Sequence, residues 1–126
     1  MEYGIVVVAF GVSDKDLPSR EPQPPARFRM TTMGDAVPRV GEFVELPGTK
    51  FVGVTFLVAW RETNGHGLIA EVHVMVHATP SARSDLEYQL LAGDFQRDGW
   101  PTPFEVEAAR HSPWWDRVAT TPLVRD

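Results

Sequence analysis

The chain of 126 residues contains no cysteine, which excludes disulfide frameworks, thiolate metal sites and a cysteine nucleophile. Lysine is scarce, with only Lys15 and Lys50, and 17 acidic residues against 12 basic ones give a net charge of −5. Because binding to a phosphate backbone needs clustered positive charge, we expect no nucleic-acid partner. An acidic chain is better suited to a basic protein partner.

Long apolar runs are also missing. The two longest, residues 4–12 and 51–60, reach about half the length that a membrane-spanning helix needs. The opening residues Met1-Glu2-Tyr3 include no basic segment of the kind that begins a secretory signal. We therefore expect no membrane partner and a cytoplasmic location, or a place in an assembled particle if the protein is viral.

What is present is an ordinary globular composition, with 43% apolar and 23% charged residues. At this length it predicts a single domain over 1–126. Residues 1–79 are interpreted as a β-rich core with a Pro-rich arm at 13–26, and residues 80–126 as a helical, Trp-rich segment. Both alternate sets of residues in Tyr3–Val12 are apolar, which predicts a central strand covered on both faces. Shorter strands are expected over 27–32 and 37–46.

Two longer strands, 51–61 and 67–78, flank Asn64-Gly65 and predict a hairpin. A two-residue loop would place Val58 opposite Glu71, whereas a three-residue loop over 63–65 places Val58 opposite Ala70 and makes every pair on that face apolar. A one-residue slip exchanges the two faces, and burying unpaired polar groups costs several kcal/mol. We therefore predict the three-residue loop, with an apolar face lining the core. The outer face would gather Phe51, Glu71, His73, Met75 and His77.

The C-terminal third predicts two short helices. Ser84–Glu87 and Thr102–Glu105 match the capping box, and place helices at about 85–92 and 103–111. Strands followed by helices are typical of an α+β fold. The expected architecture is a small antiparallel twisted sheet or a partly open β-barrel, with the helices covering one opening.

The run Pro38-x-Val40-Gly41-Glu42-x-Val44-x-Leu46 and the hairpin after it resemble the small SH3-like barrel proteins of bacteria and their viruses. The resemblance covers residues 37–78, a third of the chain, and includes no functional motif. It implies a partly open SH3-like barrel and carries no residue role with it.

The usual chemical motifs are not found. His73 and His77 lie about 13 Å apart on a strand, too far to share a metal ion. Ser81 and Asp85 follow His77 in sequence, but no Gly-x-Ser-x-Gly elbow accompanies a serine, and no glycine loop leads into a helix. We therefore expect no catalytic residue, no metal and no cofactor.

The aromatic residues give the leading hypothesis, a non-enzymatic protein-interaction domain. Tryptophan is enriched in interface hot spots, and adjacent Trp114 and Trp115 cannot both enter one small core from an extended segment. In the alternative interpretation, one of the two closes the barrel. The residues expected to bind a partner are Trp100, Trp114, Trp115, Phe51, Met75 and His77.

Several roles remain open within and beside this hypothesis. The partner would be another protein or a second copy of this chain, and the protein would be an assembly or accessory subunit of a bacterial virus or mobile element. One alternative is an acidic inhibitor or immunity-type protein for a basic target. Another is a small enzyme that uses His73 with Glu71 or a loop acid such as Asp35. A third is a single-strand nucleic-acid binder that uses Trp60 and Arg61.

Overall fold

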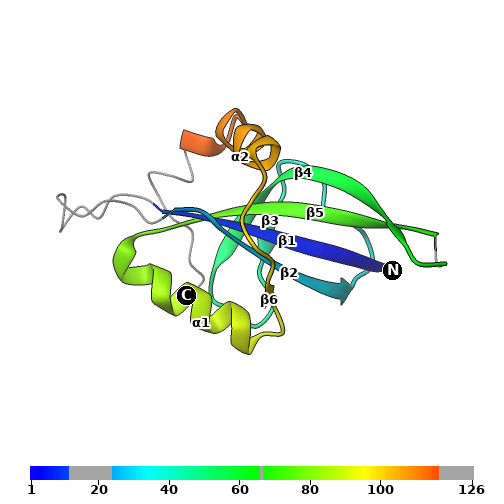
Figure 1. Cartoon of the computed structure of the whole chain (residues 1–126), viewed down its shortest axis with the longest axis horizontal. Coiled ribbons are helices and arrows are strands. Elements are labelled where there is room, and N and C mark those ends of the chain that lie inside the picture. The colour runs from blue at the N-terminus through cyan, green and yellow to red at the C-terminus, as the bar shows by residue number, and fades with distance from the viewer. Residues whose placement is uncertain (12–23, 66, 117–126) are drawn as a thin grey trace.

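A computed structural model of the chain describes residues 1–11, 24–65 and 67–116. The predicted Pro-rich arm lies outside these residues except for its last three positions, as do residues 117–126. The described residues form one curled sheet with two short helices (Figure 1). The strands are β1 (Glu2–Gly11), β2 (Ala26–Met33), β3 (Phe43–Glu45), β4 (Val52–Thr63), β5 (Gly67–Ala78) and β6 (Gln96–Arg97), and the helices are α1 (Pro80–Ala92) and α2 (Pro103–Arg110).

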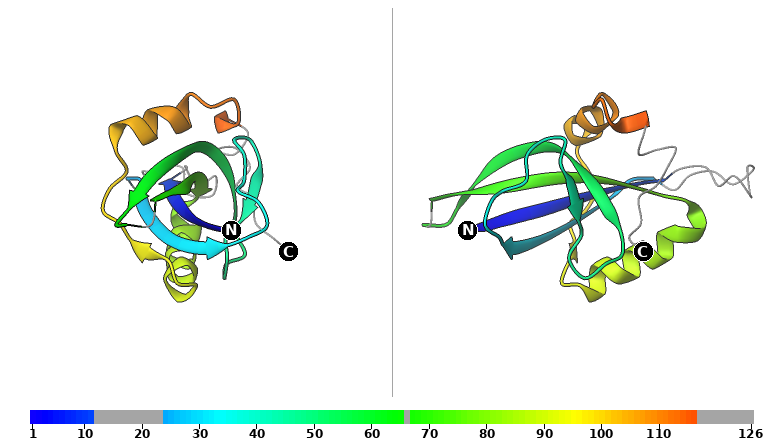
Figure 2. Two further views of the ribbon diagram at one scale, coloured as in Figure 1. Left: turned by 90° about the vertical axis from the view of Figure 1, so that its right-hand side faces the viewer. Right: turned by 180° about the vertical axis from the view of Figure 1, so that it is seen from behind.

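The sheet has the order β3-β4-β5-β1-β2-β6 and curls into a half-barrel (Figure 2). The α+β class and the partly open barrel agree with the sequence prediction. A purely antiparallel sheet is wrong, because β1 runs parallel to β5 while it pairs antiparallel with β2. Among the described residues, neither helix is long and apolar enough to cross a membrane.

The central position of β1 confirms the prediction from its two apolar sets. Val7 belongs to a core cluster that includes Leu86 and Leu90 of α1. Val8 belongs to a second cluster that includes Ala109 of α2. The two helices therefore pack on opposite faces of the sheet, and β1 is buried on both sides.

The predicted hairpin register is wrong. Thr63 pairs with Gly67, so that Val58 lies opposite Val72 instead of Ala70, and a β-bulge between Thr55 and Leu57 shifts the pairing again. Beyond the bulge, Val54 turns to the α2 face, where it packs with Met75. The extra residue of a bulge bends a strand and changes which face its side chains occupy.

The helices start from different signals. Helix α2 has the predicted capping box, because Thr102 Oγ1 accepts from the Glu105 N–H at 3.1 Å and Glu105 Oε1 accepts from the Thr102 N–H at 3.3 Å. Helix α1 begins at Pro80 with Thr79 as its N-cap, five residues before the predicted start at Asp85. Proline is favoured in the first turn, because an N–H at that position would have no acceptor within the helix and proline has none to leave unpaired. The strand expected over 37–46 shortens to Phe43–Glu45.

Candidate functional site

The residues predicted to bind a partner do not share one surface. Trp100 is exposed, with 72% of its surface accessible, whereas Trp114 and Trp115 are half-buried. The expected exposure of Phe51, Met75 and His77 is wrong, since all three are buried. Phe51 lies in the cluster beneath α1, and Met75 lies in the cluster that α2 covers.

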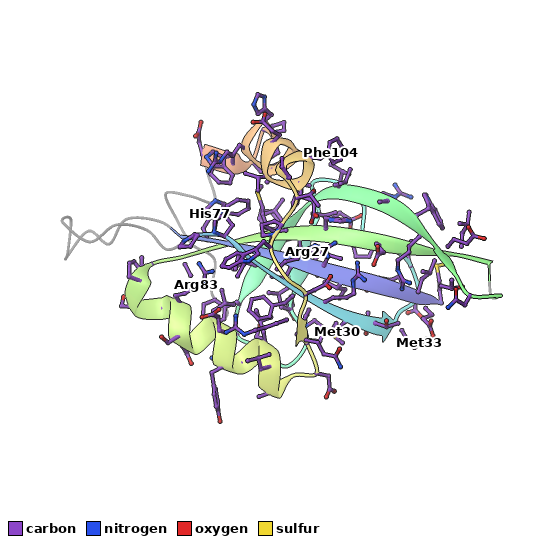
Figure 3. All side chains as sticks on the ribbon, viewed as in Figure 1. Arg27, Met30, Met33, His77, Arg83 and Phe104 are labelled. Atoms are coloured by element: carbon purple, nitrogen blue, oxygen red, sulfur yellow. The ribbon has the colours of Figure 1, made fainter. Side chains whose placement is uncertain are left out.

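His77 lies in an aromatic cage between β1 and the residues that follow α2. Its ring centroid is 5.4 Å from that of Phe10 and 4.5 Å from that of Trp115. Among the residues that the structure describes, neither ring nitrogen has a hydrogen-bond partner. Burial lowers the pKa of His77 to about 4. The ring is therefore uncharged at neutral pH and is buried between the sheet and the segment after α2 (Figure 3).

Trp114 and Trp115 both help to close the cluster beneath α2. Trp115 makes an edge contact with Phe10, with ring centroids 4.8 Å apart. Trp114 lies against Gly41, where a Cβ atom would come 2.7 Å from Trp114 Cζ2. Gly41 also has a φ of +94°, so glycine is favoured there by both space and conformation. Partner binding by these two tryptophans stays a prediction.

A buried polar network occupies the strand face that was expected to be open. His73 Nδ1 lies 3.3 Å from Glu105 Oε2, and Arg27 Nε donates to the same oxygen at 3.1 Å. Arg27 also pairs with Asp98. Burial lowers the pKa of His73, and Glu105 partly opposes this shift. Burial raises the pKa of Glu105, but the hydrogen bond with the Thr102 backbone and the charge of Arg27 outweigh that effect and lower it.

The enzyme alternative required Glu71 to pair with His73, but the two side chains form no ion pair. Its Oε2 lies 3.3 Å from Arg29 Nη2 and 3.3 Å from Arg61 Nε, in ion pairs whose geometry makes no hydrogen bond to that oxygen. Gly4 of β1 lies beside the Glu71 carboxylate, at a distance where a Cβ would make ordinary contact. The charged groups on this face, from β2, β4, β5 and the residues after β6, thus neutralise one another.

A pocket of about 470 Å³ lies where α1, the start of β2 and the segment after β6 meet. Arg83 and Glu87 reach it from α1, where four-residue spacing places them on one helix face. Arg97, Gly99 and Trp100 form another wall, and Pro24 and Ala26 form the third. Gly99 has a φ of +65°, the left-handed conformation that glycine tolerates, in the turn that leads to Trp100.

The pocket has an unusual charge distribution. Arg97 is paired with Glu87 at 3.1 Å and lies over the Phe28 ring. Arg83 is only 3% exposed, and its guanidinium donates from Nη2 to the Pro24 carbonyl at 3.1 Å. Within the described part of the chain, its Nε and Nη1 have no acceptor. Burial lowers the pKa of Arg83, Glu87 opposes this effect and Arg97 adds to it.

Sequence reasoning missed this pocket, although it identified Trp100. The predicted helix began at residue 85, so Arg83 lay outside it. The four-residue spacing between Arg83 and Glu87 therefore did not indicate a shared helix face. The signal that could have placed Arg83 is Thr79-Pro80, an N-cap followed by proline at the first helical position. The other walls come from residues 24–26 and 97–100, which no local pattern connects to α1.

His73 lines neither this pocket nor a smaller one of about 240 Å³ beside Glu2, Thr63, Leu68 and Ile69. In the ranges that the structure describes, no three histidine or acidic side chains gather closely enough to hold a metal ion. Comparison with protein-family models, with curated proteins and with solved structures finds no match to this chain. Function therefore has to be inferred from the geometry of the site itself.

Proposed function

We propose that this protein is a non-enzymatic protein-interaction domain that binds its partner at Trp100 and the adjacent pocket. The observation that carries the proposal is the exposure of the Trp100 indole at the wall of a basic pocket. Tryptophan gives a large, rigid contact area, and burying it on binding would contribute roughly 3 kcal/mol before the costs of association. Such aromatic side chains beside a pocket are typical of interface hot spots.

A second exposed aromatic side chain follows Trp100 closely in the sequence. Phe104, in the first turn of α2, is also largely exposed and points away from the sheet (Figure 3). It lies four residues beyond Trp100 in the sequence, directly after the segment that joins β6 to α2. An extended partner segment could contact both rings while inserting one group into the pocket.

The finer roles are also proposals. The resemblance of residues 37–78 to small SH3-like barrels supports an accessory subunit of a bacterial virus or mobile element. The net charge of −5 supports the alternative, an inhibitor of a basic target. Binding to a basic target would weaken steeply with added salt, whereas contact through Trp100 would depend little on salt.

The test places a photo-crosslinking phenylalanine analogue at position 100 in the producing cell. Position 60 is the matched control, because Trp60 is similarly exposed, at 66%, in β4. We expect a discrete adduct from position 100, which wild-type protein competes away and Trp100→Ala does not. Because Trp100 is exposed, this variant should unfold at the wild-type temperature. Identical adducts from positions 60 and 100, or none from position 100, would contradict the proposal.

A further inference from the structure

The positive charge of the buried Arg83 guanidinium is not compensated by an ion pair within the described fold. Taking a charged group out of water costs several kcal/mol unless a counter-charge and hydrogen bonds compensate it. Arg83 is buried, yet Nε and Nη1 have no acceptor and no ion pair joins it to a carboxylate among the described residues. Both nitrogens are covered in this conformation, but they belong to a side chain that lines an open pocket, and a small rotation of the guanidinium would bring them to a ligand acceptor there.

The charge of the lining selects the kind of anion. Two arginines against one glutamate leave one positive charge in excess. Arg97 is already paired with Glu87, so the excess charge resides on Arg83. A carboxylate with one negative charge matches this excess. A dianionic phosphate would overcompensate it and would be repelled by the Glu87 carboxylate nearby.

The other walls select what the carboxylate is attached to. Trp100, Pro24 and Ala26 offer an aromatic plane and two small apolar surfaces. The pocket volume of about 470 Å³ lies in the lower part of the range for small-ligand sites. It suits one ring or one large side chain together with its acid group.

We propose that this pocket binds a carboxylate attached to an aromatic or large apolar group, with Arg83 as the anion anchor and Trp100 as the apolar wall. This ligand chemistry has two sources, the C-terminal residue of a peptide chain and a free aromatic acid. The inference goes beyond the proposed function, because the pocket can take such a carboxylate whether or not the protein has a protein partner.

The experiment titrates the full chain with matched acids and amides and follows the indole N–H resonance of Trp100, assigned with Trp100→Phe. The free-acid probes are phenylacetate and the peptide N-acetyl-Ala-Phe, and phenylacetamide and the C-terminal amide of the same peptide are the neutral controls. Because hydrogen bonds to charged groups contribute about 1.5–3 kcal/mol, each acid that fits should bind at least about tenfold more tightly than its amide. Binding of the peptide acid alone identifies a chain terminus, whereas binding of phenylacetate alone identifies a free acid.

Two variants assign the anchor. Arg83→Met keeps the unbranched stem of the side chain and removes the charged guanidinium, and should weaken acid binding by about tenfold or more. Arg110→Met, on the exposed surface of α2, removes the same charge from the opposite face of the sheet and should leave binding unchanged. The acid-against-amide comparison uses the unaltered protein, so it stays decisive even if Arg83→Met does not fold.

Three results would overturn the inference. They are equal binding of acids and amides, full binding by a folded Arg83→Met variant, and a response to inorganic phosphate stronger than that to either acid. The outcome is separable from that of the proposed function. Crosslinks from position 100 without carboxylate binding would refute the ligand chemistry alone, and carboxylate binding without crosslinks would refute the protein partner alone.

Discussion

The aromatic cage of His77 predicts a specific acid sensitivity. Burial lowers the pKa of His77 from 6.5 to about 4, so the unfolded state binds a proton more readily than the folded state. The stability that comes from holding the ring uncharged is fully present above pH 6.5 and is lost as the pH falls toward 4. At about 1.4 kcal/mol per pKa unit, the whole shift corresponds to about 3 kcal/mol, of which about 2 kcal/mol is lost by about pH 5.

The perturbation that isolates this effect is His77→Phe. Phenylalanine keeps a ring between Phe10 and Trp115 but has no titratable nitrogen. It also removes two buried nitrogens that find no partner in the described part of the chain, so the variant should be equal to the wild type or about 1 kcal/mol more stable at neutral pH. The difference between the two proteins should then widen by about 2 kcal/mol between about pH 7 and about pH 5.

The assay is urea unfolding at a series of pH values, followed by tryptophan fluorescence and circular dichroism. His73, whose pKa is also lowered, and Glu105 remain in both proteins, so their contributions cancel in the comparison. His111→Gln is the control, because His111 is exposed and its loss should leave the acid limb unchanged. Parallel loss of stability in the wild type and His77→Phe would refute the reasoning about the cage.

Two further predictions concern the helices. Glu105→Gln should lower the free energy of unfolding by about 3 kcal/mol, because it leaves the charge of partly buried Arg27 with a weaker partner. The control is Glu107→Gln on the exposed face of α2, which should change the free energy of unfolding by less than about 0.5 kcal/mol. Equal effects in chemical denaturation would mean that the buried pair is not stabilising. Thr79→Ala should cost about 1 kcal/mol as the loss of the α1 N-cap, and Ser84→Ala should cost little. A larger loss for Ser84→Ala would favour the later helix start that the sequence predicts.

The elements that the sequence predicted well have their determinants close together in the chain. β1 was recognisable because both alternate residue sets over 3–12 are apolar. This pattern is typical of a strand that is covered on both faces. Helix α2 was recognisable because Thr102, Pro103 and Glu105 supply its cap, its first residue and its capping-box partner.

The hairpin register failed for a reason that lies outside the hairpin. The prediction assumed that one face of β5 meets solvent, so that an apolar pattern would select the register. Helix α2 and Trp115 cover that face, and Met75 and His77 are as buried as the residues opposite them. With both faces buried, the alternation of apolar and polar residues no longer distinguishes the registers. The residue types of Thr55-Phe56-Leu57 also do not predict the bulge.

The candidate site was predictable only in its exposed tryptophan. Glu105 was fully explained as a capping residue, so its second role as the partner of Arg27 and His73 could not be seen from spacing. Arg83 is an ordinary arginine in sequence, and it becomes unusual only when Pro24 and Trp100 close around it. Such features depend on tertiary contacts between distant segments, for which a single sequence has no local pattern.

The parallel pairing of β1 with β5 has a consequence for synthesis on the ribosome. Within this sheet β1 is translated before the other described strands, and its parallel partner, residues 67–78, follows only after most of the sheet-forming chain has been translated. Until then, β2 can occupy just one edge of an apolar strand, and the other edge stays open to unwanted pairing. The nascent chain should therefore be most prone to aggregation, and most in need of a chaperone, between the appearance of β2 and that of β5.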